Sequence, residues 1–190
     1  MSPIQLDIHK DIVEKARTGN SKAQRELYHL YGRSMYNICC RMMNNSAEAE
    51  DMLQEVFIEA FTRLDSFRFE STIGAWLKRI TINKCINELR KRKVELDYGS
   101  INPNVMVEEE QEEDDVEVAL SVDRIKHAMG LLPDGYRVVF SLYMLEGYDH
   151  EEISRILNIS ESTSKTQLLR GKKKIIEILK AGEIQTPGKN

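Results

Sequence analysis

The sequence predicts an all-α protein in which two small helical domains are joined by an acidic, flexible linker. Three observations lead to this class. Apolar residues recur three, four or seven positions apart along most of the chain, which is the spacing of one helix face. With only 4 Pro and 10 Gly in 190 residues, few positions interrupt a helix. The helical period is lost between Asp97 and Asp115 and resumes at Val118, and no segment shows the alternation of a strand.

The bulk composition indicates a cytoplasmic protein. With 41% hydrophobic and 31% charged residues the chain can build modest cores, but no run is long and apolar enough to cross a bilayer. Residues 1–10 lack the basic and apolar parts of a signal peptide. The cysteines are Cys39, Cys40 and Cys85, an odd number without CxxC spacing, which disfavours a disulfide framework or a zinc site. We therefore expect no metal, no cofactor and no direct membrane insertion.

The first expected domain, residues 1–96, contains four helices. Gly19, the pair Asn44-Asn45 and a loop from Asp65 to Thr72 separate them. The helices are expected from Ile4 to Ala16, from Asn20 or Ser21 to Asn44, from Ser46 to Leu64, and from Ile73 to Val94. Opposite its core stripe, the third helix shows an acidic and amide face made of Asp51, Gln54, Glu55 and Glu59. Spacing alone would leave this face to solvent.

Residues 97–117 predict the linker. Gly99, Asn102 and Pro103 break regular structure, and the acidic run from Glu108 to Asp115 repels itself and stays extended. The second expected domain covers residues 118–182. Residues 183–190 are expected to form a frayed tail.

The end of the second domain has the pattern of a helix-turn-helix. Asp149 can cap a short helix, with Glu152 three residues on as in a capping box. Asn158 ends that helix, because Asn tolerates the left-handed conformation, and Ser160 caps a second helix after a very short turn. Leu168 marks the apolar stripe of this second helix.

Opposite that stripe, the second helix carries polar and basic side chains that suit the DNA major groove. The candidates for reading base edges are Lys165, Thr166, Gln167 and Arg170. The candidates for phosphate contacts are Ser162, Lys172, Lys173 and Lys174. The alternative is a surface hairpin with a solvated charged face. The capping, the turn and the basic bias agree, so the sequence favours DNA binding.

The charge distribution suggests that a larger partner brings this chain to DNA. The net charge is −4, but Lys78 to Lys93 and Lys165 to Lys174 are basic while Glu108 to Glu117 is acidic. DNA affinity depends on how many phosphates are neutralised. Two small basic patches on an acidic protein predict weak binding to DNA alone.

Several segments resemble one family in order and spacing. Region 2 of the sigma-70 family is similar to Ala49-Glu50-Asp51-Met52-Leu53-Gln54-Glu55-Val56-Phe57, to Trp76-Leu77-Lys78-Arg79-Ile80 with Asn83, and to Leu89-Arg90-Lys91. Its region 4 is similar to Leu132-Pro133, Arg137-Val138-Val139-Phe140, Glu152-Ile153 and Thr163-Ser164-Lys165. With only these two regions, the chain resembles the small extracytoplasmic-function sigma factors over roughly Ile12 to Leu179. It departs from them at Ser154, Asn158 and Ser164, where the family often has Ala, Gly and Val.

The resemblance implies a sigma factor that binds core RNA polymerase and promoter DNA and directs promoter-specific initiation, without being an enzyme. Region 2 would open the −10 element and region 4 would read the −35 element in the major groove. The polymerase contact would lie on Asp51, Gln54, Glu55 and Glu59. The −10 strand would meet Phe67, Arg68, Phe69, Lys78, Arg79, Asn83 and Lys84. The family commonly has a partner anti-sigma factor, and no small-molecule substrate is implied.

An unstacked base needs an aromatic face or loop pocket, with cations beside it to hold the backbone. The loop of Phe67 and Phe69, just before a basic helix, offers both. The alternative is that both rings fill the core, and we expect that at least one does. Trp76 is expected in the core rather than as a stacking platform.

Two other classes of function fit the sequence less well. A stand-alone DNA-binding regulator would need a ligand pocket or a dimer helix in the first half, where the sequence instead has an acidic helix face and a basic helix. An enzyme would need a catalytic constellation. The four histidines are scattered without accompanying carboxylates or cysteines, which argues against an enzyme.

Overall fold

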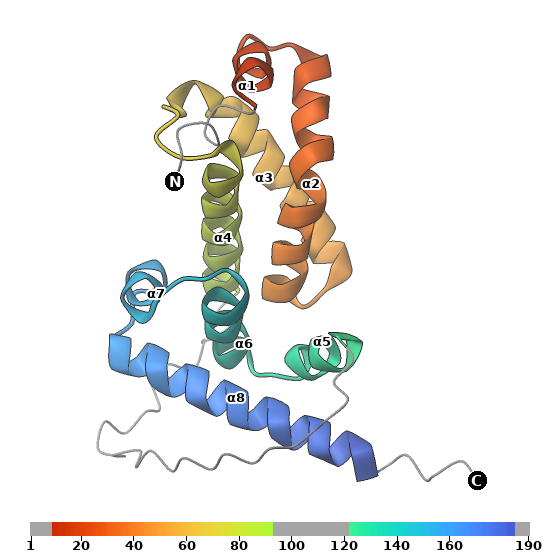
Figure 1. Ribbon diagram of the computed structural model, residues 1–190, viewed down its shortest axis with the longest axis vertical. Helices are drawn as coiled ribbons and strands as arrows, with labels where there is room; N and C mark the ends of the chain where they lie inside the picture. The colour runs from red at the N-terminus through yellow and green to blue at the C-terminus, as the bar shows by residue number, and fades with distance from the viewer. Residues whose placement is uncertain (1–8, 93–121, 185–190) are drawn as a thin grey trace, which may run out of the picture. The chain divides into compact units, whose positions relative to one another are not determined.

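The computed structural model describes residues 9–92 and 122–184, with side chains described as far as Ala181. Every regular element in these ranges is helical, which confirms the expected class (Figure 1). The chain divides between Lys93 and Val94 into two units. The expected linker at 97–117, the expected helix start at Val118 and residues 185–190 lie outside the described ranges.

The first unit contains four α-helices, and asparagines set several of their ends. They are α1 (Lys10–Arg17), α2 (Ser21–Met43), α3 (Ser46–Thr62) and α4 (Ile73–Lys91), with a short 3-10 turn at Leu64–Ser66. The Asn20 side chain caps α2. Asn44, in the left-handed conformation at φ 56°, ends α2, and Asn45 accepts the first free amides of α3. Two adjacent residues therefore make the whole connection between α2 and α3.

In this unit α2, α3 and α4 pack against one another, and α1 packs on α2. The side chains that fill the core include Leu27, Met42, Val56, Phe57, Leu77 and Ile86. Each buried side chain of this size contributes about 1.5–3 kcal/mol before the entropy of ordering is subtracted. The packed core leaves one face of α3 and one face of α4 open, and these faces carry the predicted sites.

The start of α1 is held by a ring of α2. Tyr31 Oη lies 2.6 Å from Nδ1 of His9, the residue before α1, and the two rings meet edge to face. Gly74, in the first turn of α4, makes room for the same ring, because a Cβ there would lie 2.9 Å from Tyr31 Cε1. Tyr31 therefore stands between the beginnings of α1 and α4.

The second unit is built on one long helix. Its elements are α5 (Val122–Gly130), α6 (Asp134–Phe140), a π-helical turn (Ser141–Leu145), α7 (His150–Leu157) and α8 (Glu161–Ile184). The three shorter helices α5, α6 and α7 all pack on α8 (Figure 1). The core includes Val138, Val139, Leu142, Ile153, Leu157 and Leu168.

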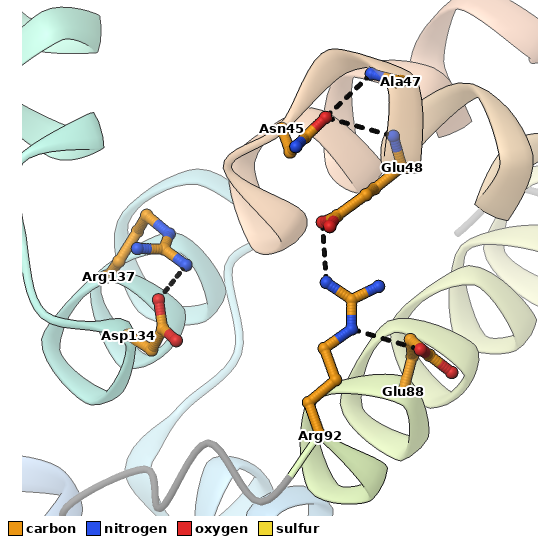
Figure 2. A network of polar contacts seen from close by, with 7 residues as sticks. All are labelled: Asn45, Ala47, Glu48, Glu88, Arg92, Asp134 and Arg137. Atoms are coloured by element: carbon orange, nitrogen blue, oxygen red, sulfur yellow. Dashed lines mark hydrogen bonds and ion pairs between the residues drawn. The ribbon is translucent and has the colours of Figure 1, made fainter.

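Arg137 fixes the connection between α5 and α6. Its side chain is 3% exposed and donates to the Leu132 carbonyl at 3.1 Å. It also pairs with Asp134, as Figure 2 shows. A buried guanidinium needs such partners, since an uncompensated charge in the core is costly. The Leu-Pro turn before α6 is therefore held from inside the unit.

The structure confirms the helix-turn-helix. Asp149 and Glu152 form both halves of the capping box at the start of α7. Asn158 is left-handed at φ 58°, and Ser160 Oγ accepts from the amide of Thr163 at 3.0 Å. The three residues Asn158 to Ser160 therefore turn the chain from α7 into α8.

Candidate nucleic-acid and polymerase interfaces

The first turns of α8 place most of the expected DNA-contact residues at the surface. Ser162 and Lys165 are exposed, and Thr166 and Arg170 are partly exposed. The Thr166 hydroxyl donates back to the Ser162 carbonyl at 2.9 Å, so its methyl group and the acceptor lone pairs of its oxygen remain to meet a base.

The expectation that Gln167 faces outward is wrong. Its side chain is 1% exposed, on the same stripe as the buried Ser164 and Leu168. The helix repeat explains this, because position 167 lies three residues after Ser164 and four before Gly171, which packs against Tyr136 of α6. Gln167 supports the recognition helix from within the unit and is removed from the base-reading set.

The lysines of α8 keep their charges available for phosphates. Lys165 pairs with Glu161 at 3.8 Å and Lys174 with Glu177 at 3.1 Å, on exposed side chains. Exposed pairs of this kind are worth at most about 1 kcal/mol, so a phosphate can replace them. Within the described residues, the exposed Lys172 and Lys173 make no ion pair.

In the first unit, the loop before α4 contains one buried and one partly exposed aromatic ring. Phe67 is 4% exposed, which confirms that at least one of the two Phe side chains fills the core. Phe69 is partly exposed and its ring centroid lies 4.9 Å from that of Phe67. The Trp76 ring centroid lies 5.4 Å from that of Phe67, and Trp76 is only partly buried, so it is not the core residue that was expected. Arg68 is exposed. Phe67 is the buried ring of this loop, and the rings of Phe69 and Trp76 both contact it.

The backbone of Phe69 adopts an uncommon conformation. Its φ is 57°, in the left-handed region that bulky residues rarely enter. The Arg17 guanidinium lies 5.3 Å and the Lys10 ammonium 5.8 Å from the ring centroid. Such backbone conformations persist only where surrounding contacts hold them, and they cluster at functional sites.

The cations of α4 separate into two faces. Arg79 and Asn83 lie on an exposed row that Arg90 continues, at spacings of four and seven residues. Arg90 was not among the predicted site residues, although its spacing could have included it. Lys78 is partly buried next to this row.

Lys84 lies on the other face of α4, against the acidic face of α3. Its ammonium is 2.9 Å from Glu55 and 3.5 Å from Glu59. The hydrogen bond from Lys84 lowers the pKa of Glu55. Burial lowers the pKa of Lys84, but the bonds to both carboxylates raise it by more, so its pKa is raised. Two residue sets that the sequence kept apart therefore meet here.

A groove of about 330 Å³ lies between α3 and α4, and Lys84, Glu55 and Glu59 line it. Its lining residues are Met52, Glu55, Glu59, Lys84, Asn87, Glu88 and Lys91. Asp51 is exposed one helical turn before Glu55, and the exposed Gln54 directly precedes Glu55. A surface of alternating carboxylates, amides and ammonium groups can bind a polar protein partner through paired charges.

Arg92 ties the start of α3 to the end of α4. It donates from Nη1 to Glu48 at 2.6 Å and from Nε to Glu88 at 3.1 Å, while Asn45 caps the helix that carries Glu48 (Figure 2). This network joins α3 and α4 at the end opposite the aromatic loop.

Two general findings concern the part of the chain that the structure describes. None of its helices combines the length and the apolar character that crossing a membrane requires. It also contains no group of three or more His, Cys, Asp or Glu side chains that could hold a metal ion.

A helix-turn-helix with a basic recognition helix, together with a helical unit that presents separate acidic and basic faces, defines a helical DNA-binding protein. Models of two protein-domain families match the chain, sigma-70 region 2 at residues 27–95 and sigma-70 region 4 at residues 123–175. The chain belongs to the sigma-70 family and, within it, to the extracytoplasmic-function (ECF) sigma factors. It acts in promoter-directed transcription initiation with RNA polymerase.

Individual relatives agree with this placement. The chain is 33% identical over 172 residues to the ECF RNA polymerase sigma factor SigW of Bacillus subtilis, covering 86% of this chain and 92% of the relative. It is 27% identical over 183 residues to the ECF RNA polymerase sigma-E factor of Escherichia coli K12, covering 86% and 90%.

One solved structure shares the fold. It is the sigma factor RpoE of Bartonella quintana in complex with the anti-sigma factor NepR, at a TM-score of 0.55 and 23% identity, over 82% of this chain and 96% of that one.

Proposed function

We propose that the first domain, residues 1–96, opens the −10 element, and that the second, residues 118–182, reads the −35 element in the major groove. The observation that carries the proposal is the row of cations and hydroxyls at the surface of the first turns of α8. This row comes directly after the turn at Asn158 that ends the capped helix α7. A recognition helix contacts base edges with its N-terminal residues, which is where this row lies.

For the −35 element, the residues that support the proposal fall into two groups, those that can reach base edges and those that can bind phosphates. Lys165, Thr166 and Arg170 lie within the first ten residues of α8 and can reach base edges, with Arg suited to guanine. Ser162 lies in the first turn, where free amides favour a phosphate. Lys172, Lys173 and Lys174 follow and can neutralise phosphates along the groove.

For the −10 element, the loop before α4 and the exposed row of α4 support the proposal together. Arg68 is exposed and Phe69 is partly exposed beside the buried Phe67. Arg79 and Asn83 then continue along α4, with Lys78 beside them. An unstacked base can lie against the aromatic loop while these side chains bind the backbone of the single strand.

For core polymerase, we propose the acidic face of Asp51, Gln54, Glu55 and Glu59, with Lys84 as part of the same surface. Its support is the groove and the ion pairs described above. A contact made of paired charges sets orientation and suppresses wrong partners. The chain is proposed to act in the cytoplasm and to catalyse no reaction itself.

We also propose an anti-sigma factor as a partner. The support is at the level of fold. RpoE of Bartonella quintana was solved with an anti-sigma factor, and a second neighbour, CnrH, was solved with the cytosolic domain of CnrY at a TM-score of 0.52 and 20% identity.

The test is reconstitution with core polymerase, followed by run-off transcription and chemical probing of the melted strand. The purified chain is expected to co-purify with core enzyme and to start transcription at discrete sites. The double variant Asp51→Lys with Gln54→Lys is expected to lose co-purification at unchanged helix content. The matched control Glu26→Lys with Asn37→Lys, on the exposed face of α2, adds the same charge and is expected to bind normally. Normal binding of the α3 variant would remove this face from the polymerase interface.

A further inference from the structure

Arg17, the last residue of α1, reaches across to the loop that precedes α4. Its Nη2 donates to the Phe67 carbonyl at 2.6 Å, and its Nε donates to the Leu64 carbonyl at 3.3 Å. The same guanidinium lies 5.3 Å from the centre of the Phe69 ring. One side chain, from a helix about 50 positions earlier in the chain, therefore contacts the loop at three points.

These contacts are made beside the part of the loop with the unusual backbone conformation, at Phe69. The Phe67 ring packs against Trp76, and the Phe67 carbonyl accepts a hydrogen bond from Arg17. The left-handed Phe69 follows two residues later, with its ring against the same guanidinium. Arg17 is only about a quarter exposed, at 28% of its side chain, so its hydrogen bonds are partly shielded from water. Such charge-assisted bonds to backbone carbonyls are among the stronger ones in proteins.

We propose that Arg17 is a positioning residue for base capture at the −10 element, which makes α1 part of the promoter-opening machinery. The inference rests on the proposed function of the loop. A loop that must order itself when the base arrives loses binding free energy to that ordering, and a loop held beforehand does not. Arg17 holds the loop through two backbone carbonyls and lies over the Phe69 ring, and it leaves Arg68 exposed and Phe69 partly exposed for the strand.

A lysine cannot replace this contact. The guanidinium presents several donors in a fixed planar fork and can stack on a ring, whereas an ammonium is a point charge on a flexible stem. Arg17→Lys keeps the charge and much of the apolar stem, so it separates loop geometry from electrostatics and from the packing of α1.

The experiment measures how much the holoenzyme gains from each base of the −10 non-template strand. A promoter is first found by run-off transcription. Single-stranded oligonucleotides of its −10 strand, each with one abasic position, then compete for binding to the holoenzyme. The parent holoenzyme is expected to lose about tenfold in affinity when the captured base is removed, as for other base–aromatic contacts. With Arg17→Ala or Arg17→Lys the same removal is expected to cost at most about threefold.

The matched control is Arg25→Ala, an exposed arginine of α2, which is expected to keep the full tenfold difference. A thermal unfolding curve accompanies each variant. Lower stability alone weakens intact and abasic strands equally and leaves their ratio unchanged, so an unchanged ratio in the Arg17 variants overturns the proposal. If Arg17→Ala fails to fold, the ratio for Arg17→Lys decides.

The same experiment distinguishes a failure of the proposed loop function from a failure of the role proposed for Arg17. If the parent holoenzyme discriminates at no position, the loop captures no base, and both the loop's function and the role of Arg17 fall. If the parent discriminates and the Arg17 variants discriminate equally well, only the role of Arg17 falls.

Discussion

Ser164 of the recognition helix and His150 at the start of α7 meet inside the helix-turn-helix, with Ser164 Oγ 2.8 Å from His150 Nδ1. Ser164 is fully buried, and Tyr143 stacks on the imidazole at a centroid distance of 4.6 Å. The Ser164 hydroxyl therefore joins α7 and α8 by a directed hydrogen bond.

Removing the hydroxyl is expected to destabilise the second unit. Ser164→Ala deletes one buried hydrogen bond and leaves a ring nitrogen without that partner, which costs about 0.5–1.5 kcal/mol. Urea unfolding of the full chain measures the change. Ser162→Ala, two residues earlier on the exposed side of α8, is the control and is expected to change stability much less. Equal effects of both substitutions would show that the buried bond contributes nothing.

The same histidine makes stability depend on pH. Partial burial, and then the positive charge of Lys165, lower the pKa of His150 from its usual 6.5, with Lys172 acting in the same direction and Glu161 and Asp149 opposing. The folded state therefore binds the proton more weakly than the unfolded state. The stabilisation is fully present above the unfolded pKa, about 6.5, and is lost as the pH falls toward the lower folded pKa.

The measurement compares the free energy of unfolding of the parent and of His150→Gln between pH 5 and pH 8. The parent is expected to lose more stability on the acid side than the variant does. Other groups titrate equally in both proteins, so their difference isolates His150. Parallel curves would contradict the expectation.

Substitutions of Arg170 and Gln167 are expected to have different effects, one on promoter recognition and the other on stability. Arg170→Ala removes a candidate base contact worth about 1–3 kcal/mol and should weaken transcription only from promoters with an intact −35 element. Gln167→Ala empties a buried position and should lower the unfolding temperature instead. Run-off transcription on intact and scrambled −35 templates, beside thermal unfolding, separates the two. The exposed Lys126→Ala on α5 is the control for loss of one positive charge.

Lys84 and Arg79 are both cations of α4, but their variants should affect different partners. Lys84→Ala leaves Glu55 and Glu59 without their ammonium partner and should change affinity for core polymerase. Arg79→Ala, on the exposed row, should weaken binding of the holoenzyme to single-stranded −10 DNA and leave polymerase affinity unchanged. Fluorescence titrations with labelled core enzyme and labelled oligonucleotide measure both. A loss of DNA binding by both variants would return Lys84 to the −10 site.

Local signals were sufficient for most of the fold. Asn44, Asn45, Asp149 and Asn158 act within one or two turns of the chain, so their capping roles were readable from neighbouring residues. The helical period found the apolar stripes for the same reason. The comparison with relatives then placed these elements in one family.

The errors and gaps arise where the outcome depends on distant residues. Lys84 meets an acid 29 positions away, and no local pattern reports that pair. Gln167 is polar, yet it lies on a stripe whose small members pack against other helices, Gly171 against α6 and Ser164 against α7. Phe67 and Phe69 have the same chemistry two residues apart, and only the packing of Trp76 and Arg17 distinguishes the buried ring from the partly exposed one.

Gly74 connects the start of α4 with the start of α1, because the Tyr31 ring lies between them. A methyl group at position 74 would come within 2.9 Å of Tyr31, whose hydroxyl meets His9 just before α1. The ring would have to move, and its contact with His9 couples that movement to the start of α1. Because Arg17 ends the same short helix and holds the aromatic loop, position 74 of α4 is linked to that loop through α1.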